Sequence, residues 1–392
     1  MSTFEVKVVK VDSVEKHPDA DRLTIVSIAG YKCISNLKDD GTWRYNAGDL
    51  VVYIPESAVL PEWLLKKMGF WKEEENKGTL AGSKGDRVKA IRLRGIFSQG
   101  ILYPVNVMID NSQHTIKTDT SEIFVKDGSD VANDLGITKY EPPVPVHMTG
   151  EVASAPSVTL KYDIENLQKY TRVFEEGEEV VVTEKLHGTW ACLAYVPGLN
   201  NPELLYGDYF ATSKGMSGAG RFFKNNEANA NNLYHKQLLS EIDFLEQKIK
   251  MVDILGRISS SYESIPVYVL GEIFGAGVQD LTYGASKPVF RVFDIYVGTP
   301  TQGRYLNDAE LEKIVAGNAL TRVPVLYRGP YSMEKMVELR DGNTKFAEVK
   351  QIREGIVIKT TIERENKWIG RVQLKFVSPD YLLRKGNATE FQ

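Results

Sequence analysis

The first hundred residues alternate apolar and polar side chains in short runs. Runs of this kind cover residues 4–8, 50–54, 88–91 and 100–103, with turn-forming residues between them. Alternation with a period of two is typical of half-buried strands, and several short strands separated by turns favour a small antiparallel barrel. We therefore predict a β-barrel domain at residues 1–145.

A proline-rich segment follows this domain. Four prolines fall between residues 140 and 162, among small residues. Proline disfavours helix and stiffens an extended chain, so this composition is typical of a linker. We predict a linker at residues 146–165 and a second domain at residues 166–392.

The second domain mixes strand and helix patterns. Apolar runs predict strands at residues 179–182, 267–270 and 289–297. Residues 227–255 predict one long helix, because apolar side chains recur at helical spacing, at Leu238, Ile242, Leu245, Ile249 and Val252. The predicted fold class of the whole chain is α+β.

Composition and charge exclude few classes of protein. The 392 residues, of which 42% are apolar and 26% charged, suit a globular protein of two domains. The net charge of −4 neither indicates nor excludes nucleic acid, because a local groove of Lys and Arg suffices to hold a few phosphates. Cys33 and Cys192 form neither a metal-ligand motif nor a disulfide framework, so we expect reduced thiols.

The sequence also carries no recognisable membrane or export signal. No run approaches the ~18 apolar residues of a membrane span, and the first ten residues lack an apolar signal core. We expect a cytoplasmic protein, a monomer, that does not bind membranes.

A lysine motif carries the candidate chemistry. The segment EKLHGT, residues 184–189, directly follows the predicted strand. Lys185 can project from a rigid strand end, while Gly188 would let the backbone approach a phosphate closely. A nucleophilic lysine needs a lowered pKa, which burial and nearby positive charge supply. By itself, so short a motif is better explained by a surface lysine before a turn.

Later segments strengthen the catalytic interpretation. In chain order these are TSKG at residues 212–215, LGEIFG at 270–275, RVFDI at 291–295, REGIVIK at 353–359 and LKF at 374–376. Each is weak alone. Together they reproduce the motif order of the covalent nucleotidyltransferases.

On these motifs, residues 160–385 resemble the adenylyltransferase domain of ATP-dependent RNA ligases, an ATP-grasp-like nucleotidyltransferase domain of antiparallel sheets and helices. His187, where many DNA ligases and capping enzymes have Asp, favours an RNA ligase. Residues 17–23 resemble the opening of OB-fold modules that bind tRNA. Residues 94–100 resemble the OB domain that precedes the catalytic domain in a nick-sealing branch of these ligases.

The resemblance implies a reaction through a lysine–AMP intermediate. Lys185 would attack the α-phosphorus of ATP and release pyrophosphate. AMP would then pass to a 5′-phosphate, and a 3′-hydroxyl would displace it. Lys359 and Lys375 would neutralise the α-phosphate. The implied partner is RNA, or an RNA-containing duplex with a break.

The same resemblance assigns the remaining site residues. Glu184 would read the adenine amino group, Glu272 would hold the ribose, and Phe293 would stack on the base. Glu354, assisted by Glu272, would bind Mg²⁺ or Mn²⁺. His187 and Gly188 count with the nucleotide-binding residues, although His187 could equally serve only to orient the loop.

Two further residues are expected to contact the substrate, and two positions depart from the family pattern. Ser213 and Lys214 would bind the substrate phosphate near the 3′ end. Trp190 stands where relatives often have a small polar residue. Gln373 replaces the first of two lysines in the last motif, so phosphate neutralisation could depend on Lys359 or on Arg371.

Two alternative functions remain open at this point. A capping guanylyltransferase or a DNA ligase shares the lysine chemistry, but such enzymes usually carry their OB domain after the last motif. An RNA-binding protein with an inactive ligase-like domain would bind RNA and form no protein–nucleotide adduct. Labelling with ATP but not with GTP distinguishes the RNA ligase from the capping enzyme.

Overall fold

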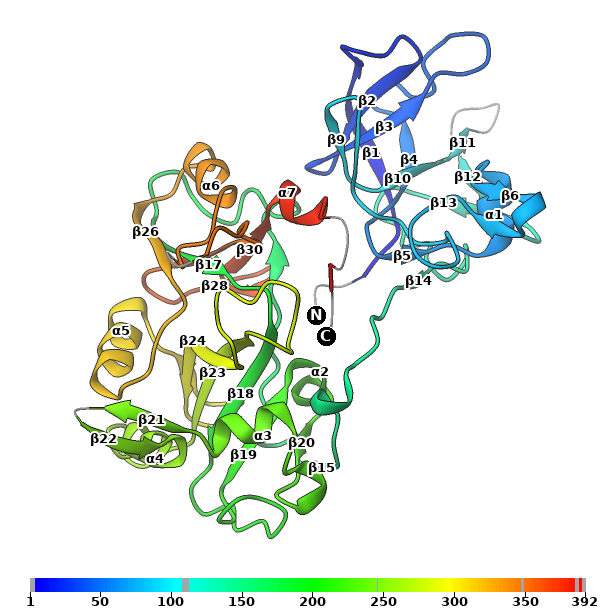
Figure 1. Cartoon of the computed structure of the whole chain (residues 1–392). Coiled ribbons are helices and arrows are strands. Elements are labelled where there is room, and N and C mark those ends of the chain that lie inside the picture. Colours follow the sequence, from blue (N-terminus) through cyan, green and yellow to red (C-terminus); the bar gives the residue numbers. More distant parts are fainter. Residues whose placement is uncertain (1–3, 108–112, 245, 347–348, 385–387, 390–392) are drawn as a thin grey trace. The chain divides into compact units, whose positions relative to one another are not determined.

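The computed structural model describes residues 4–107, 113–244, 246–346, 349–384 and 388–389. The chain divides into two compact units (Figure 1). The smaller, which we call the barrel unit, comprises residues 2–141 and 168–171. The larger, which we call the large unit, comprises residues 142–167 and those from 172 onward.

A five-stranded antiparallel sheet forms the centre of the barrel unit. Its spatial order is β10 (Ile101–Pro104), β4 (Leu50–Ile54), β1 (Lys7–Lys16), β2 (Leu23–Ile28) and β3 (Tyr31–Asn36). A second sheet contains β11 (Asn106–Val107), β12 (His114–Lys117) and β13 (Glu122–Val125). Shorter elements are β5 (Ala58–Val59), α1 (Glu62–Lys67), β6 (Trp71–Lys72), η1 (Glu73–Glu75), β7 (Lys77–Gly78), β8 (Ile91–Leu93), β9 (Ile96–Ser98) and β14 (Thr138–Lys139).

Strand β4 shows how the alternating pattern builds this unit. Val52 and Ile54 belong to one buried cluster, whereas Val51 and Tyr53 belong to another. Successive side chains of a strand point to opposite faces, so β4 contributes to apolar cores on both sides of the sheet. The predicted strand at 88–91 is wrong in its position, because only β8, which begins at Ile91, is a strand there.

Two sheets of five strands each form the large unit (Figure 1). The first, sheet I, has the order β16 (Glu165–Asn166), β30 (Gln373–Val377), β27 (Gly355–Thr360), β17 (Glu179–Lys185) and β26 (Val325–Pro330). The second, sheet II, has the order β19 (Tyr209–Ser213), β18 (Thr189–Tyr195), β23 (Val267–Phe274), β24 (Val289–Val297) and β25 (Arg304–Tyr305). All neighbouring strands are antiparallel except β16 and β30.

Helices and short hairpins surround these sheets. The helices are η2 (Val146–Met148), α2 (Lys214–Gly218), η3 (Glu227–Asn229), α3 (Leu233–Leu238), α4 (Met251–Ser260), α5 (Asp308–Gly317), α6 (Met333–Arg340) and α7 (Pro379–Leu382). The remaining strands are β15 (Val152–Ser154), β20 (Arg221–Phe223), β21 (Glu241–Phe244), β22 (Gln247–Lys250), β28 (Glu365–Asn366) and β29 (Gly370–Arg371). None of the helices in the described part of the chain is long and apolar enough to cross a membrane.

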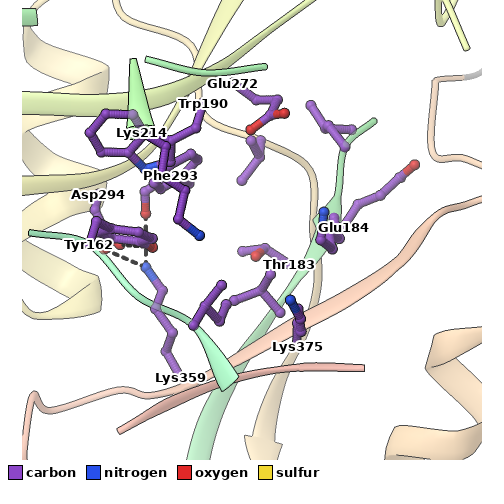
Figure 2. Close-up of a pocket in the computed structure, with 15 residues that line it drawn as sticks. Tyr162, Thr183, Glu184, Trp190, Lys214, Glu272, Phe293, Asp294, Lys359 and Lys375 are labelled. Atoms are coloured by element: carbon purple, nitrogen blue, oxygen red, sulfur yellow. Dashed lines mark hydrogen bonds and ion pairs between the residues drawn. The ribbon is translucent and has the colours of Figure 1, made fainter. Parts of the chain in front are cut away.

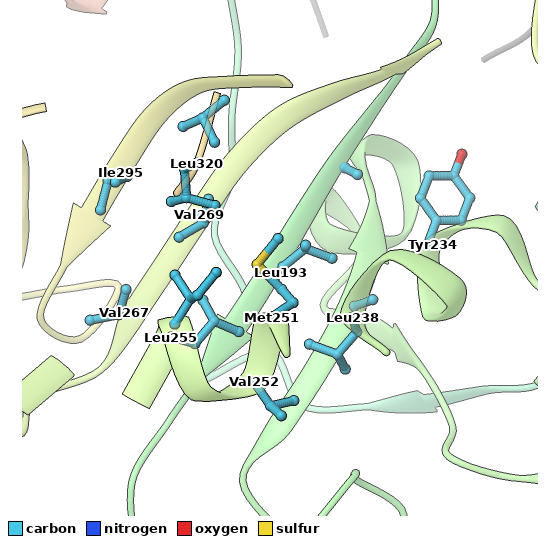
Figure 3. Packing of buried hydrophobic residues seen from close by; sticks show 14 of the residues in the cluster. Leu193, Tyr234, Leu238, Met251, Val252, Leu255, Val267, Val269, Ile295 and Leu320 are labelled. Carbon is cyan, nitrogen blue, oxygen red and sulfur yellow. The ribbon is translucent and has the colours of Figure 1, made fainter. Parts of the chain in front are cut away.

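Helix α4 closes the apolar core beside sheet II (Figure 3). Met251 and Leu255 are buried on the face of α4 that meets Leu193 of β18 and Val269 of β23. Fully burying such side chains contributes roughly 1.5–3 kcal/mol each. This core keeps β18 and β23 in place, and both strands carry residues that bound the pocket described below.

The long helix predicted at residues 227–255 is wrong. The segment forms η3, α3, the hairpin β21–β22 and only then α4. Ile242 pairs directly with Ile249 across the hairpin, and Glu246 in its turn has a φ of 67°, which a helix does not allow. Residues seven apart share one face of a helix, but they also face each other across a hairpin with a two-residue loop. The predicted position Leu245 lies outside the described residues.

The predicted linker at residues 146–165 is part of the large unit. Its strand β15 pairs with β20, and β16 begins within it and pairs with β30. The change of unit falls earlier, between Glu141 and Pro142. Prolines mark extended backbone, but they do not prevent extended backbone from joining the edge of a sheet.

Candidate active site

The motif lysine lies where the chain passes from one sheet to the other. Lys185 is the last residue of β17 in sheet I, and β18 of sheet II begins at Thr189. The short turn between them therefore brings both sheets to the same pocket (Figure 2). The pocket is lined by Tyr162, Ile164, Thr183, Glu184, Lys185, Leu186, Trp190, Lys214, Glu272, Phe293, Asp294, Val323, Val357, Lys359 and Lys375.

Lys185 forms an ion pair with Glu354. Its Nζ lies 2.6 Å from Glu354 Oε1, because Lys185 pairs in register with Gly355, the neighbour of Glu354. Burial would lower the pKa of Lys185, but the negative charges of Glu354 and Glu272 outweigh it and raise that pKa. The lowered pKa expected from the sequence is therefore wrong for this arrangement, because the neighbouring charges are carboxylates as well as lysines.

The two carboxylates beside Lys185 offer oxygen ligands for a cation. Glu354 Oε2 is buried and has no hydrogen-bond partner among the residues that the structure describes. Burial, with Glu354 adding to it, raises the pKa of Glu272 to about 8 despite the opposing effect of Lys185. Within the described ranges, no group of three or more His, Cys, Asp or Glu side chains is placed to hold a metal. Two carboxylates still suit Mg²⁺, which takes few protein ligands and retains several waters.

Lys375 and Lys214 bring further positive charge to the pocket. Lys375 lies on β30 of sheet I, whereas Lys214 is the first residue of α2. Burial, together with the charges of Lys185 and Lys214, lowers the pKa of Lys375 to about 7. A pocket that carries several cations as well as carboxylates suits a ligand with phosphates and a metal ion.

Three aromatic rings form another wall of the pocket (Figure 2). The ring of Tyr162 lies 5.5 Å from that of Phe293 and 5.8 Å from that of Trp190, tilted by 44° against each. Phe293 is only partly buried, so its ring is not simply core. Sequence reasoning missed Tyr162, which lies in the segment predicted as a linker and outside every motif.

Lys359 is held by a buried acidic residue. Its Nζ lies 2.7 Å from Asp294 Oδ1 and 2.8 Å from the Phe293 carbonyl oxygen. Arg371 donates two further hydrogen bonds of 2.8 Å to the Asp294 carboxylate. Arg371 also donates to Glu363 Oε2 at 2.8 Å, so Asp294 and Glu363 together compensate the positive charges of Lys359 and Arg371. Arg371, which the sequence offered for phosphate neutralisation, is not among the residues that line the pocket.

Gln373 joins the same network in place of a lysine. Its Oε1 accepts from Arg371 at 3.1 Å and lies 3.0 Å from the Tyr162 hydroxyl, which is also 2.9 Å from Asp294. Its Nε2 donates to the Asp163 carbonyl oxygen at 3.0 Å. A lysine here would add a third buried cation beside Lys359 and Arg371, whose charges Asp294 and Glu363 already balance, so a neutral amide suits this position.

Glu184 is almost completely buried at the pocket, with 1% exposure. Its Oε2 accepts a 2.8 Å hydrogen bond from the backbone N–H of Lys345, whereas Oε1 has no partner in the described part of the chain. Burial raises the pKa of this carboxyl even though hydrogen bonds from Thr344 and Lys345 oppose it. An anchored carboxylate with one unpaired oxygen can accept a hydrogen bond from an amino group.

Four of the residues expected at the site lie beside the pocket and do not line it: Glu354, which reaches it through its ion pair with Lys185, and His187, Gly188 and Ser213. His187 is buried against Asp280 and Tyr381. Gly188 faces β23, where a Cβ would lie 2.1 Å from the Ile273 carbonyl oxygen, so close packing of the backbone accounts for this glycine. Ser213 caps α2, with its hydroxyl 3.5 Å from the Met216 nitrogen.

Comparison with known families agrees with this fold. The large unit has two sheets, and Lys185 lies just before the turn that joins them, near acidic and basic side chains. The motif order predicts this architecture for a nucleotidyltransferase domain. A family model described as RNA ligase matches residues 178–377, more than half of the chain, and an OB-fold domain model matches residues 5–105. The chain belongs to the RNA ligase family, with an amino-terminal OB-fold domain.

Solved structures of one RNA ligase share the fold over nearly the whole chain. A Naegleria gruberi RNA ligase mutant with ATP and Mn is 20% identical, with a TM-score of 0.68 over 97% of this chain and 98% of that chain. The Naegleria gruberi RNA ligase with PPi is 21% identical, with the same TM-score and coverage. No curated protein sequence matches this chain significantly.

Proposed function

We propose that this protein is an ATP-dependent RNA ligase that joins 3′-hydroxyl and 5′-phosphate ends through lysyl-AMP on Lys185 and an adenylylated RNA. The observation that carries the proposal is the position of Lys185 Nζ, in a pocket with Glu354 at 2.6 Å and with Lys375, Glu184 and Phe293 in its walls. One pocket thus offers a nucleophile, phosphate ligands and groups suited to a nucleobase. The ATP and Mn named with the Naegleria ligase fit the same chemistry.

Different pocket residues bind different parts of the nucleotide. Phe293 offers a ring face to the base, and Glu184 Oε1 accepts from an exocyclic amino group. Glu272 would hold the ribose. Lys375 and Lys359 offer positive charge to the α-phosphate, although Lys359 shares its charge with Asp294. Ser213 and Lys214 would contact the RNA phosphate.

The first chemical step forms a P–N bond at Lys185. Nζ attacks the α-phosphorus of ATP, the bond to the bridging oxygen of the β-phosphate breaks, and pyrophosphate leaves. Lys185 attacks only as the uncharged amine, so its ion pair with Glu354 has to break first. Mg²⁺ or Mn²⁺ held by Glu354 and Glu272 would supply positive charge against the phosphates.

We propose that the barrel unit binds nucleic acid beside the break. The break is a nick in which the strand with the 3′-hydroxyl is RNA. A groove in this unit is lined by the basic residues Arg44, Lys67, Arg87 and Lys89 and by Tyr45, and its described lining contains no Asp or Glu. Basic side chains with aromatic rings suit a nucleic-acid backbone and its bases. Action as a monomer in the cytoplasm remains part of this proposal.

The test of the enzyme is incubation with labelled ATP and a divalent metal. We expect a covalent protein–AMP adduct with wild type and with Lys248→Ala, an exposed lysine on β22, and none with Lys185→Ala. Labelling with GTP instead would indicate a capping enzyme. RNA binding without any adduct would indicate an inactive ligase-like domain.

The test of the substrate is a panel of nicked duplexes with RNA or DNA on each side of the break. We expect sealing to require RNA at the 3′-hydroxyl end. Equal sealing of an all-DNA nick would contradict the assignment. In the barrel unit, the double variant Arg44→Glu, Lys67→Glu should weaken sealing more than self-adenylylation. An equal loss of the two activities would indicate a role in folding.

A further inference from the structure

A buried network holds the histidine of the lysine motif from two later parts of the chain. The His187 side chain is 4% exposed. Its Nε2 lies 2.7 Å from Asp280 Oδ1, in the segment between β23 and β24. Its Nδ1 lies 2.7 Å from the hydroxyl of Tyr381, which is on α7. Its backbone N–H donates to the Tyr283 hydroxyl at 2.7 Å.

Residues after α7 make further contacts with Asp280 and Tyr381. Arg384 Nε donates to Asp280 Oδ2 at 3.1 Å, and its guanidinium lies 3.7 Å from the centre of the Tyr381 ring. Thr389 donates to Asp280 Oδ1 through both its N–H and its hydroxyl, each at 3.0 Å. We call Asp280, Tyr283, Tyr381, Arg384 and Thr389 the His187 network.

The network determines which nitrogen of His187 carries a proton. Burial opposes ionisation of Asp280, but hydrogen bonds from His187, Thr389 and Arg384 hold its pKa well below its usual range. An ionised carboxylate only accepts, so the proton lies on Nε2, and Nδ1 can accept from the Tyr381 hydroxyl.

Apolar packing connects the same helix to the residue beside the nucleophile. Leu186 and Tyr381 belong to one buried cluster, together with Phe274 and Leu281. Leu186 and His187 directly follow Lys185; His187 is bound to the Tyr381 hydroxyl, and Leu186 lies in the same apolar cluster as Tyr381. The turn that leads from β17 to β18 is therefore fixed by contacts from α7 and from the segment after β23.

We propose that the His187 network positions Lys185 for adenylylation, with Tyr381, Arg384 and Asp280 as positioning residues that act through His187. None of them lines the pocket, and none is expected to touch the nucleotide. Small displacements of a nucleophile cost large factors in rate without weakening substrate binding. The inference rests on the proposed role of Lys185 as the nucleophile.

The experiment measures single-turnover formation of lysyl-AMP over a range of ATP concentrations. Tyr381→Phe keeps the ring in its cluster and removes only the hydroxyl, and Asp280→Asn keeps the shape and removes the charge. We expect both to slow adenylylation at saturating ATP by about tenfold, with little change in the ATP concentration that gives half the maximal rate. Thermal unfolding, followed in parallel, reports whether either variant is misfolded.

Tyr331→Phe is the matched control. Tyr331 is as buried as Tyr381, but its hydroxyl has no hydrogen-bond partner among the described residues, and it stacks on Phe174 away from the pocket lining. We expect it to adenylylate at the wild-type rate. If Tyr381→Phe and Asp280→Asn match this control, the positioning role is wrong.

A double-mutant comparison separates positioning from general support of the fold. If Tyr381 acts through the imidazole, Tyr381→Phe should have no further effect in a His187→Ala background. If its full effect persists there, Tyr381 does not act through His187, and the inference fails. Absence of any adduct with wild type would instead refute the proposed function itself.

Discussion

Lys185 donates a hydrogen bond of 2.6 Å to Glu354, a residue 169 positions later in the chain. The contact forms because β17 and β27 pair in register, with Lys185 opposite Gly355. It places the nucleophile and a candidate metal ligand in direct contact. The charge of each therefore determines the behaviour of the other, and this has measurable consequences.

The first prediction concerns the pKa of Lys185. Glu354 raises this pKa, so Glu354→Gln should lower it, and Lys185 should become reactive toward an amine reagent at lower pH. Competitive acetylation across a pH range, read by mass spectrometry at Lys185, measures the midpoint. Glu203→Gln, which removes a partner of Lys224 at the surface, is the control and should leave the midpoint unchanged. An unchanged midpoint in Glu354→Gln would contradict the charge coupling.

The second prediction concerns nucleotide affinity and Lys375. With a pKa of about 7, Lys375 is mainly charged at pH 6 and mainly neutral at pH 8. If its charge binds phosphate, the affinity for ATP should fall over this range, by roughly up to tenfold. Lys375→Arg keeps the charge throughout and should reduce the fall, while titration of ATP itself is common to both proteins. Identical pH profiles from isothermal titration would refute a phosphate-binding role.

The third prediction concerns stability and Glu272. Its pKa is raised from 4.5 to about 8, so between these values the folded protein binds a proton that the unfolded chain has released. The stabilisation that this proton gives is complete below 4.5 and is lost as the pH rises through 8. Glu272→Gln does not titrate, so its melting temperature should exceed that of wild type by roughly 2–5 °C at pH 8, and by less at pH 5. An equal difference at both pH values would show that burial does not raise this pKa.

The fourth prediction concerns the buried ion network around Asp294. Asp294→Asn leaves Lys359 and Arg371 buried without their shared carboxylate, and it should destabilise the protein by about 3–5 kcal/mol. Denaturant unfolding of the full chain measures this loss. Glu338→Gln, in the exposed pair with Lys335, should change stability by less than about 1 kcal/mol. A small loss in Asp294→Asn would mean that water replaces the carboxylate.

Local pattern predicted those features that depend on neighbours in sequence. Strands β4 and β24 have the predicted bounds, because period-two or continuous apolar runs determine which faces can be buried. The same local argument failed for residues 227–255, where Ile242 and Ile249 fit a helix and a hairpin equally well. Only the turn at Glu246 and the packing of α4 on sheet II decide between the two.

The sequence by itself determined the family, the strand that presents Lys185 and the order of the motifs around it, because these are encoded in contiguous residues. Tertiary structure decided the electrostatics of the site. The pKa of Lys185 depends on Glu354 and Glu272. Which ring nitrogen of His187 carries the proton depends on its hydrogen bonds with Asp280 and Tyr381. Charge interactions and burial act through space between residues that lie more than eighty positions apart in the chain, so no local sequence pattern records these distances.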